Sequence, residues 1–158
     1  MNPTQANMNN PIAPAAPAGK WTTGLFGCCE DPGSCVKTSC CPCITFGQNA
    51  VILDRNDTIC FPSGLVFCLL AHIGVACLYS YPYRHRLREQ YGLPEQPCGD
   101  CILHWCCGPC AVCQEYRELK NRDLNPSKGW ESHAARFTNG GAPAAMAPPP
   151  VAQGMPRN

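Results

Sequence analysis

A run of twenty residues without one charged side chain, GLVFCLLAHIGVACLYSYPY at 64–83, constrains the fold of this chain more than any other feature. As a helix rising about 1.5 Å per residue, it would measure about 30 Å, the thickness of a bilayer core. Tyrosines crowd its end, and Arg84, Arg86 and Arg88 follow, an order that membrane interfaces favour. The run therefore predicts a membrane-spanning helix. The alternative is a buried helix of a soluble domain, but the chain offers no amphipathic partner helices to cover it.

A second and weaker apolar segment lies at about 98–115, after a polar connector at 84–97. It is short for a span, and Asp100 and His104 would be costly against lipid. We expect a second span here, or a re-entrant segment packed against protein. If both segments span, the termini share one side, and seven basic residues on that side against three in the connector favour the cytosol.

The remaining segments complete a mainly α membrane fold. A short helix is expected near 44–55, and the Gly- and Pro-rich stretch before it, 21–43, is predicted to be an irregular Cys-rich loop. The end at 1–20 is rich in Pro, Ala and Asn, and the end at 138–158 is rich in Gly, Ala and Pro. They contain too few large apolar side chains to offset the entropy of ordering, so both are expected to be disordered tails around one membrane domain at 21–137.

The composition narrows the classes of function. The formal net charge is +1, which gives no electrostatic case for nucleic acid. Fifteen cysteines would suit a secreted disulfide scaffold, but no signal peptide is recognisable and the number is odd. Thiols that serve as metal ligands are the favoured interpretation. The familiar enzyme motifs are missing, so we expect no enzyme.

Two clusters of cysteines are the candidate metal-binding segments. In the first, CCEDPGSCVKTSCCPC, the proline between Cys41 and Cys43 stiffens the backbone that holds the two thiols. Thiolates are soft ligands that suit Zn²⁺, Cd²⁺ or Cu⁺. Cysteines near a membrane segment are also common acylation sites, which is the alternative for Cys28 and Cys29.

The second cluster, CGDCILHWCCGPCAVC, repeats a potential ligand at every third residue. On a straight helix such a series winds around the axis, so one helix cannot present all of it to one ion. Sequential metal contacts are therefore favoured over one closed tetrahedral site, and some of the thiols are expected to be small buried apolar groups. The predicted metal ligands of both clusters are Cys40, Cys41, Cys43, Cys98, Cys101, His104, Cys107, Cys110 and Cys113.

Two carboxylates and one histidine are candidates for a cation pathway. Asp54 ends its apolar run, and Asp100 lies inside the second segment, where an acid is a functional candidate by default. A helix-end role is an equal alternative for Asp54. His72 interrupts the main run, either as a pathway group or as a histidine hydrogen-bonded between helices.

Taken together, several motifs resemble those of the plant cadmium resistance proteins. They are W-x-x-G at 21–24, TSCCPCITFGQ at 38–48, C-x-D-C-x-x-H-x-x-C at 98–107, Q-x-Y-R-E-L-K at 114–120 and GW at 129–130. These proteins belong to a larger Cys-rich family with the fruit-weight and cell-number regulators and the placenta-specific gene 8 protein. The resemblance covers about 21–131. One departure is Val51, which stands where that family has a glutamate, while Asp54 is retained.

The resemblance implies a plasma-membrane protein with two hydrophobic segments that exports or translocates Zn²⁺ or Cd²⁺ and thereby confers metal tolerance. The ion would be cargo, and no permanently bound cofactor is expected. Since one or two spans cannot enclose a polar path, transport would need a homo-oligomer among the lipids, most simply a ring. A pentamer is one such ring, although the sequence does not define the number of subunits. The alternative is a membrane-anchored metal-binding or signalling adaptor without conduction.

Overall fold

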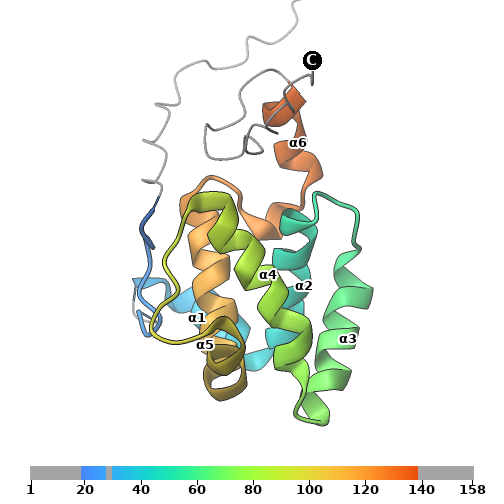
Figure 1. Ribbon diagram of the computed structural model, residues 1–158. Coiled ribbons are helices and arrows are strands. Elements are labelled where there is room, and N and C mark those ends of the chain that lie inside the picture. Colours follow the sequence, from blue (N-terminus) through green and yellow to red (C-terminus); the bar gives the residue numbers. More distant parts are fainter. Residues whose placement is uncertain (1–18, 28–29, 139–158) are drawn as a thin grey trace, which may run out of the picture.

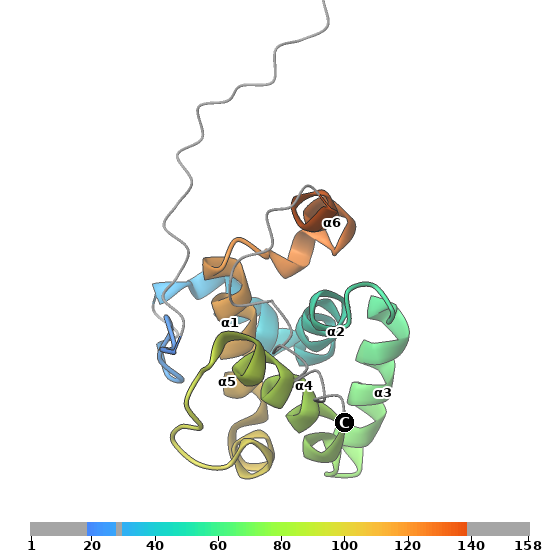
Figure 2. The ribbon, with the colours of Figure 1, turned by 45° about the horizontal axis from the view of Figure 1, so that its top comes forward.

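The computed structural model describes residues 19–27 and 30–138, with side chains as far as residue 134, and this part is mainly helical (Figure 1). The central helix is α2, which contacts α1, α3, α4 and α5 (Figure 2). In chain order the elements are α1 (Pro32–Cys40), α2 (Pro42–Leu53), α3 (Cys60–His72), α4 (Ala76–Tyr91), α5 (Asp100–Asn121), the 3₁₀ turn η2 (Pro126–Lys128) and α6 (Glu131–Thr138).

The predicted membrane span at 64–83 is wrong. The uncharged run is divided between two helices, because α3 ends at His72 and α4 begins at Ala76. Between them Gly74 adopts a left-handed φ of 78°, a conformation that glycine reaches without the steric cost of a Cβ. Among the described residues, no helix combines the length and the apolar character needed to cross a bilayer.

The second predicted span, at 98–115, is wrong for a related reason. Helix α5 has 22 residues, but its backbone leaves helical geometry at Cys107, with φ −134° and ψ 43°. Pro109 adds to the break, because it has no N–H to donate and its ring clashes with the preceding turn. The C-terminal part of α5 contains several charged residues, so the segment is a bent helix with one charged half.

The stretch predicted to be an irregular loop contains α1 and the start of α2. Pro32 and Pro42 each occupy the first turn of a helix, where a missing N–H costs nothing. Asp31 caps α1 by accepting a hydrogen bond from the Ser34 N–H at 3.2 Å. Its hydrogen bond from Lys120 lowers the pKa of Asp31 to about 2. The helix expected near 44–55 is confirmed as α2, which begins two residues earlier and ends at Leu53.

Helices α2 and α3 form a tight antiparallel hairpin through two glycines. A Cβ added at Gly47 would lie 2.4 Å from the carbonyl oxygen of Cys60. In the same way, a Cβ added at Gly64 would lie 2.6 Å from the carbonyl oxygen of Cys43. In each helix a glycine therefore packs directly against the backbone of the other helix. A larger residue at either position would force the two helices apart.

The core consists of two clusters placed along α2. One is aromatic, with the rings of Phe46 and Phe67 stacked at 4.6 Å and Tyr83 edge-on to Phe46 at 5.1 Å. The other is mainly aliphatic and joins α2 to α4, α5 and the segment after α5; its buried members are Ile52, Leu87, Tyr91, Leu93, Leu119 and Leu124. The tails predicted at 1–20 and 138–158 lie almost wholly outside the described residues.

Candidate functional site

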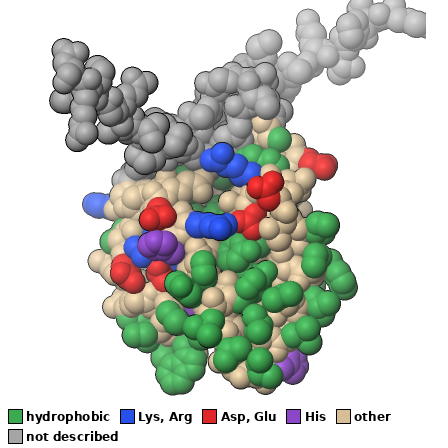
Figure 3. All heavy atoms as spheres, turned by 45° about the vertical axis from the view of Figure 1, so that its right-hand side comes forward, with side chains coloured by type: hydrophobic (Ala, Val, Ile, Leu, Met, Phe, Trp, Pro, Cys, Tyr) green, Lys and Arg blue, Asp and Glu red, His purple; other side chains and the backbone are tan. Residues whose placement is uncertain are grey.

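One end of the helix bundle carries no charged side chain among the residues that the structure describes. The sequence contains no Asp, Glu, Lys or Arg at 38–53, 58–83 and 101–114. These stretches bring the start of α2, the end of α3, the start of α4 and the first part of α5 to the same end of the bundle (Figure 1). On the face shown in Figure 3, hydrophobic side chains cover the lower part and the charges gather above them.

This end exposes large apolar side chains that a water-facing surface seldom groups together. Trp105 and Ile73 are each 71% exposed, and Leu69 is 60% exposed. We call the surface formed by Leu69, Ile73, Leu78, Ile102 and Trp105 the apolar end.

Next to the apolar end, the bend of α5 encloses a buried polar network. His104 Nε2 lies 2.8 Å from Glu115 Oε1, although the two residues are eleven positions apart on the same helix. His104 Nδ1 lies 2.9 Å from Ser80 Oγ on α4. The Ser80 hydroxyl donates its proton to the Ala76 carbonyl, so Nδ1–H must be the donor to Oγ. Both imidazole nitrogens are therefore engaged.

Arg84 on α4 lies at the centre of this network with no exposed surface. Its Nη2 donates to Gln114 Oε1 at 2.9 Å, and its guanidinium lies within ion-pair distance of Asp100 and Glu115, at 3.2 and 3.6 Å. The ring of Trp21 packs against the guanidinium, with its centroid 4.4 Å from Arg84 Cζ. Buried charges need such compensation, because their desolvation is expensive.

Neighbouring ion pairs extend the network to the N-terminal segment. Arg88 Nε donates to both carboxylate oxygens of Asp100, at 2.8 and 3.0 Å. Glu118, which is fully buried, accepts the backbone N–H of Thr22 at 2.8 Å and pairs with Arg122 at 2.7 Å. The W-x-x-G segment is therefore tied to α5 by buried charge rather than by apolar contact alone.

The predicted thiol ligands are divided among different surroundings. Cys40 and Cys41 are exposed where α1 meets α2, and Cys43, two residues after Cys41, is half-buried. Around the bend of α5, Cys106 is exposed and Cys113 is buried. Cys98, Cys101, Cys107 and Cys110 are half-buried. Cys28 and Cys29, the predicted acylation sites, lie outside the described residues.

Several thiols from different helices lie close enough to influence each other. Burial raises the pKa of Cys110, and the neighbouring Cys107 and Cys35 raise it further. Burial likewise raises the pKa of Cys101, with a contribution from its hydrogen bond to Cys77. Within residues 19–27 and 30–138, no three His, Cys, Asp or Glu side chains are grouped so that they could hold a metal ion.

The three predicted cation-pathway residues lie apart from one another. Asp100 is inside the network, while Asp54 ends α2 and pairs with Arg86, accepting also from the Tyr83 hydroxyl at 3.2 Å. His72 is exposed at the end of α3, with Nδ1 2.7 Å from the Cys68 carbonyl oxygen. Val51, at the family's glutamate position, is buried on α2.

Most of the buried network was not predicted from the sequence. Arg84 and Arg88 were expected at a membrane interface, although their spacing of four places both on one face of a helix. The segment 114–120 was noted only as part of a family motif. A helical plot of that segment would have shown Glu115 and Glu118 on one face, three residues apart. Ser80 gave no indication of its role.

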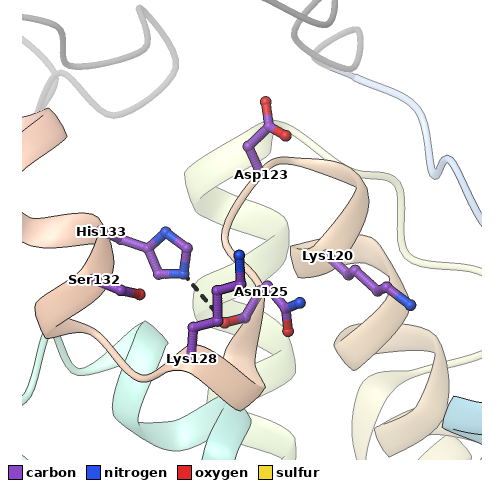
Figure 4. Close-up of a pocket in the computed structure, with 6 residues that line it drawn as sticks. All are labelled: Lys120, Asp123, Asn125, Lys128, Ser132 and His133. Atoms are coloured by element: carbon purple, nitrogen blue, oxygen red, sulfur yellow. Dashed lines mark hydrogen bonds between the residues drawn. The ribbon is translucent and has the colours of Figure 1, made fainter. Parts of the chain in front are cut away.

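A hollow of about 390 Å³ lies at the other end of the described chain, where α5, η2 and α6 meet (Figure 4). His133 Nε2–H donates to the Asn125 carbonyl at 3.1 Å, and Lys120 points away from that contact. No cysteine lines this hollow, so the metal-ligand predictions do not fall there. Its lining residues are Lys120, Asp123, Asn125, Lys128, Ser132 and His133.

The fold and the site define a small thiol-rich helical protein with a buried ionic network beside an uncharged apolar end. The chain belongs to the PLAC8 family, whose sequence model matches residues 21–118. The predicted resemblance is thereby confirmed. No solved structure matches the chain significantly.

Two relatives show the range of names in this family. Cell number regulator 7 of Zea mays is 47% identical over 148 residues, which are 91% of this chain and 82% of the relative. Protein PLANT CADMIUM RESISTANCE 12 of Arabidopsis thaliana is 45% identical over 149 residues, which are 94% of this chain and 90% of the relative.

Proposed function

We propose that this protein acts in resistance to heavy metals by binding Zn²⁺ or Cd²⁺ through its thiols at the surface of the plasma membrane. The observation that supports this most directly is the position of the exposed thiols Cys40, Cys41 and Cys106 at the uncharged end of the bundle. Soft thiolates select such ions from harder cations. Two relatives named for plant cadmium resistance, one 45% and one 46% identical, support a role in metal resistance.

The membrane part of the proposal rests on the apolar end. Its exposed side chains would be favourable among lipid acyl chains, and the absence of charge on this part of the chain removes the main cost of insertion. The protein would dip this end into one leaflet and keep its charged half in water, in the manner of interfacial proteins. This arrangement places the exposed thiols near the headgroups.

Zn²⁺ in proteins usually takes four ligands. Because the described thiols occur on several segments, ions are expected to draw ligands from more than one segment or from more than one copy. Association of copies through the apolar end would also supply the homo-oligomer that a conducting ring needs.

Two modes of action follow. In the favoured one, the protein holds metal at the membrane as an adaptor, which agrees with thiols displayed on its surface. In the other, a ring of copies passes the ion across. Zn²⁺ or Cd²⁺ flux into vesicles containing only this protein separates them: flux above empty vesicles would establish the second mode.

Replacing both Cys40 and Cys41 by serine is expected to weaken Cd²⁺ binding at least about a hundredfold, because each lost thiolate removes a soft ligand worth about 1.4 kcal/mol or more. Isothermal titration with Cd²⁺ under reducing conditions measures this. Cys68→Ser, which alters a half-buried thiol on α3, is the matched control and should leave the affinity unchanged. Equal affinities for wild type and the double variant would remove these two cysteines from the site.

Replacing Leu69 and Ile73 by glutamate is expected to abolish binding to phosphatidylcholine vesicles, because two carboxylates would have to enter the acyl region. Vesicle co-sedimentation measures the bound fraction. The control is Ile59→Glu, which alters another exposed apolar residue (70%) just before α3, at the opposite end of that helix. If wild type and the double variant sediment alike, the apolar end is not the membrane contact.

A further inference from the structure

We propose that His104 and Glu115 form a clasp that holds α5 bent and so positions the thiols of the bend, Cys106, Cys107 and Cys110. His104 would then be a positioning residue and not one of the metal ligands. The part of this inference that concerns metal capture rests on the proposed function, whereas the part that concerns the shape of α5 does not.

The distance between the two side chains shows how much the bend depends on them. Eleven residues of a straight α-helix span about 16 Å. His104 Nε2 and Glu115 Oε1 are instead 2.8 Å apart. The break at Cys107 and the missing N–H of Pro109 make the bend accessible, but neither determines its angle. We call the parts of α5 before and after the bend its two arms. A contact between the two arms does determine the angle of the bend.

His104 is held on both sides. Its Nδ1–H donates to Ser80 Oγ, and the Ser80 hydroxyl is itself tied to the Ala76 carbonyl of α4. Nε2 faces Glu115. Both ring nitrogens are engaged by these partners, so a metal ion could bind the ring only by displacing Ser80 or Glu115. The ring therefore joins α4 to both arms of α5.

The charges around the clasp oppose its opening. The side chains of His104 and Glu115 have no exposed surface. On α4, Arg84 lies 3.6 Å from Glu115, and on the first arm of α5 Asp100 is paired with Arg84 and Arg88. Gln114 of the second arm binds Arg84 as well. Separating the arms would leave a buried carboxylate without its imidazole partner, which is costly.

The bend displays its thiols on the side away from the clasp. Trp105 is 71% exposed, Cys106 and Pro109 are exposed, and Cys107 and Cys110 are half-buried. After burial, Cys107 and Cys35 on α1 also raise the pKa of Cys110. Thiols from both arms and from α1 therefore lie near one another. On a straight α5 the thiols of the two arms would also be neighbours, three or four residues apart, so the bend decides which side of the fold they face and how far they are exposed.

The test compares His104→Phe with His104→Gln in metal-free protein. Phenylalanine keeps the volume but makes neither hydrogen bond. The glutamine amide can still donate to Glu115, so it should restore the contact that joins the two arms of α5. Alkylation rates of individual cysteines, measured by mass spectrometry, report on the bend.

In the Phe variant, Cys107 and Cys110 are expected to react at least about tenfold faster, a factor that corresponds to 1.4 kcal/mol, while the Gln variant reacts like wild type. Cys40 should not change, since it lies on α1, and the buried Cys113 should stay protected. Unchanged rates at Cys107 and Cys110 would overturn the clasp. So would a common rise that includes Cys113, because that would show general loosening of the fold.

If the Phe variant does not fold, Glu115→Met gives the same comparison, since it keeps the side-chain length and removes the carboxylate that His104 contacts. Cd²⁺ titration provides the second measurement. Weaker binding in the Phe variant with wild-type binding in the Gln variant supports metal positioning by the clasp. Failure of the wild type to bind Cd²⁺ would overturn the proposed function and the metal part of this inference, while the alkylation rates would still decide whether the clasp exists.

Discussion

Replacing Gly47 with alanine is expected to lower the free energy of unfolding by about 3 kcal/mol. In an open helix the same change would raise it by about 1 kcal/mol, since alanine is the better helix former. Here the added methyl would lie 2.4 Å from the Cys60 carbonyl oxygen, a contact with backbone that no rotamer change can relieve. Helices α2 and α3 would have to separate, and the cost of such overpacking exceeds the gain in helix propensity.

Urea denaturation followed by circular dichroism measures this effect. Gly64→Ala should behave like Gly47→Ala, because its methyl would lie 2.6 Å from the Cys43 carbonyl oxygen. Gly33→Ala on α1 is the matched control: its methyl would make an ordinary contact of 3.6 Å with Asp31, and stability should stay equal or rise. A stabilised Gly47→Ala variant would show that the hairpin is looser than described.

Replacing Arg84 with methionine is expected to cost roughly 3–5 kcal/mol of stability. The guanidinium is fully buried. Its removal leaves Glu115 without the arginine that lies 3.6 Å away. Asp100 loses one of its two arginine partners and keeps only Arg88. Breaking a buried ionic network in this way is far more damaging than losing an exposed pair.

The matched control is Arg86→Met, two residues further along α4. The Arg86 side chain is 58% exposed and pairs with Asp54 at the surface, so its loss should change stability by about 1 kcal/mol or less. Thermal and urea unfolding of both variants measure the difference. Equal effects for the two arginines would mean that the network around Arg84 contributes no more than a surface ion pair does.

Some features of the site could be predicted from particular residues. Helix α2 was expected because its apolar residues follow one another without a strong breaker, and the motifs CCPC and C-x-D-C-x-x-H indicated the family correctly. The role of His104 could not be predicted in the same way. Its two partners lie 24 positions before it and 11 after it, and only the bend of α5 brings the second one into contact.

The predicted spans were wrong because hydropathy does not show where a helix ends. Hydropathy along 64–83 is the same whether the run continues as one helix or turns back at Gly74. What distinguishes the two is packing. The glycines of α2 and α3 allow the two backbones to meet, and Phe46 and Phe67 stack between the helices.

By itself, the sequence determined the chemical character of this protein: a thiol-rich, uncharged set of segments followed by alternating arginines and acids, in a pattern that defines its family. These properties depend on residue identity and short spacing alone. The tertiary structure decided which charges are buried together, where the helices break, and which thiols reach the surface. These outcomes depend on contacts between residues far apart in the chain, and burial and hydrogen-bond geometry are set only when α4 packs against the two arms of α5.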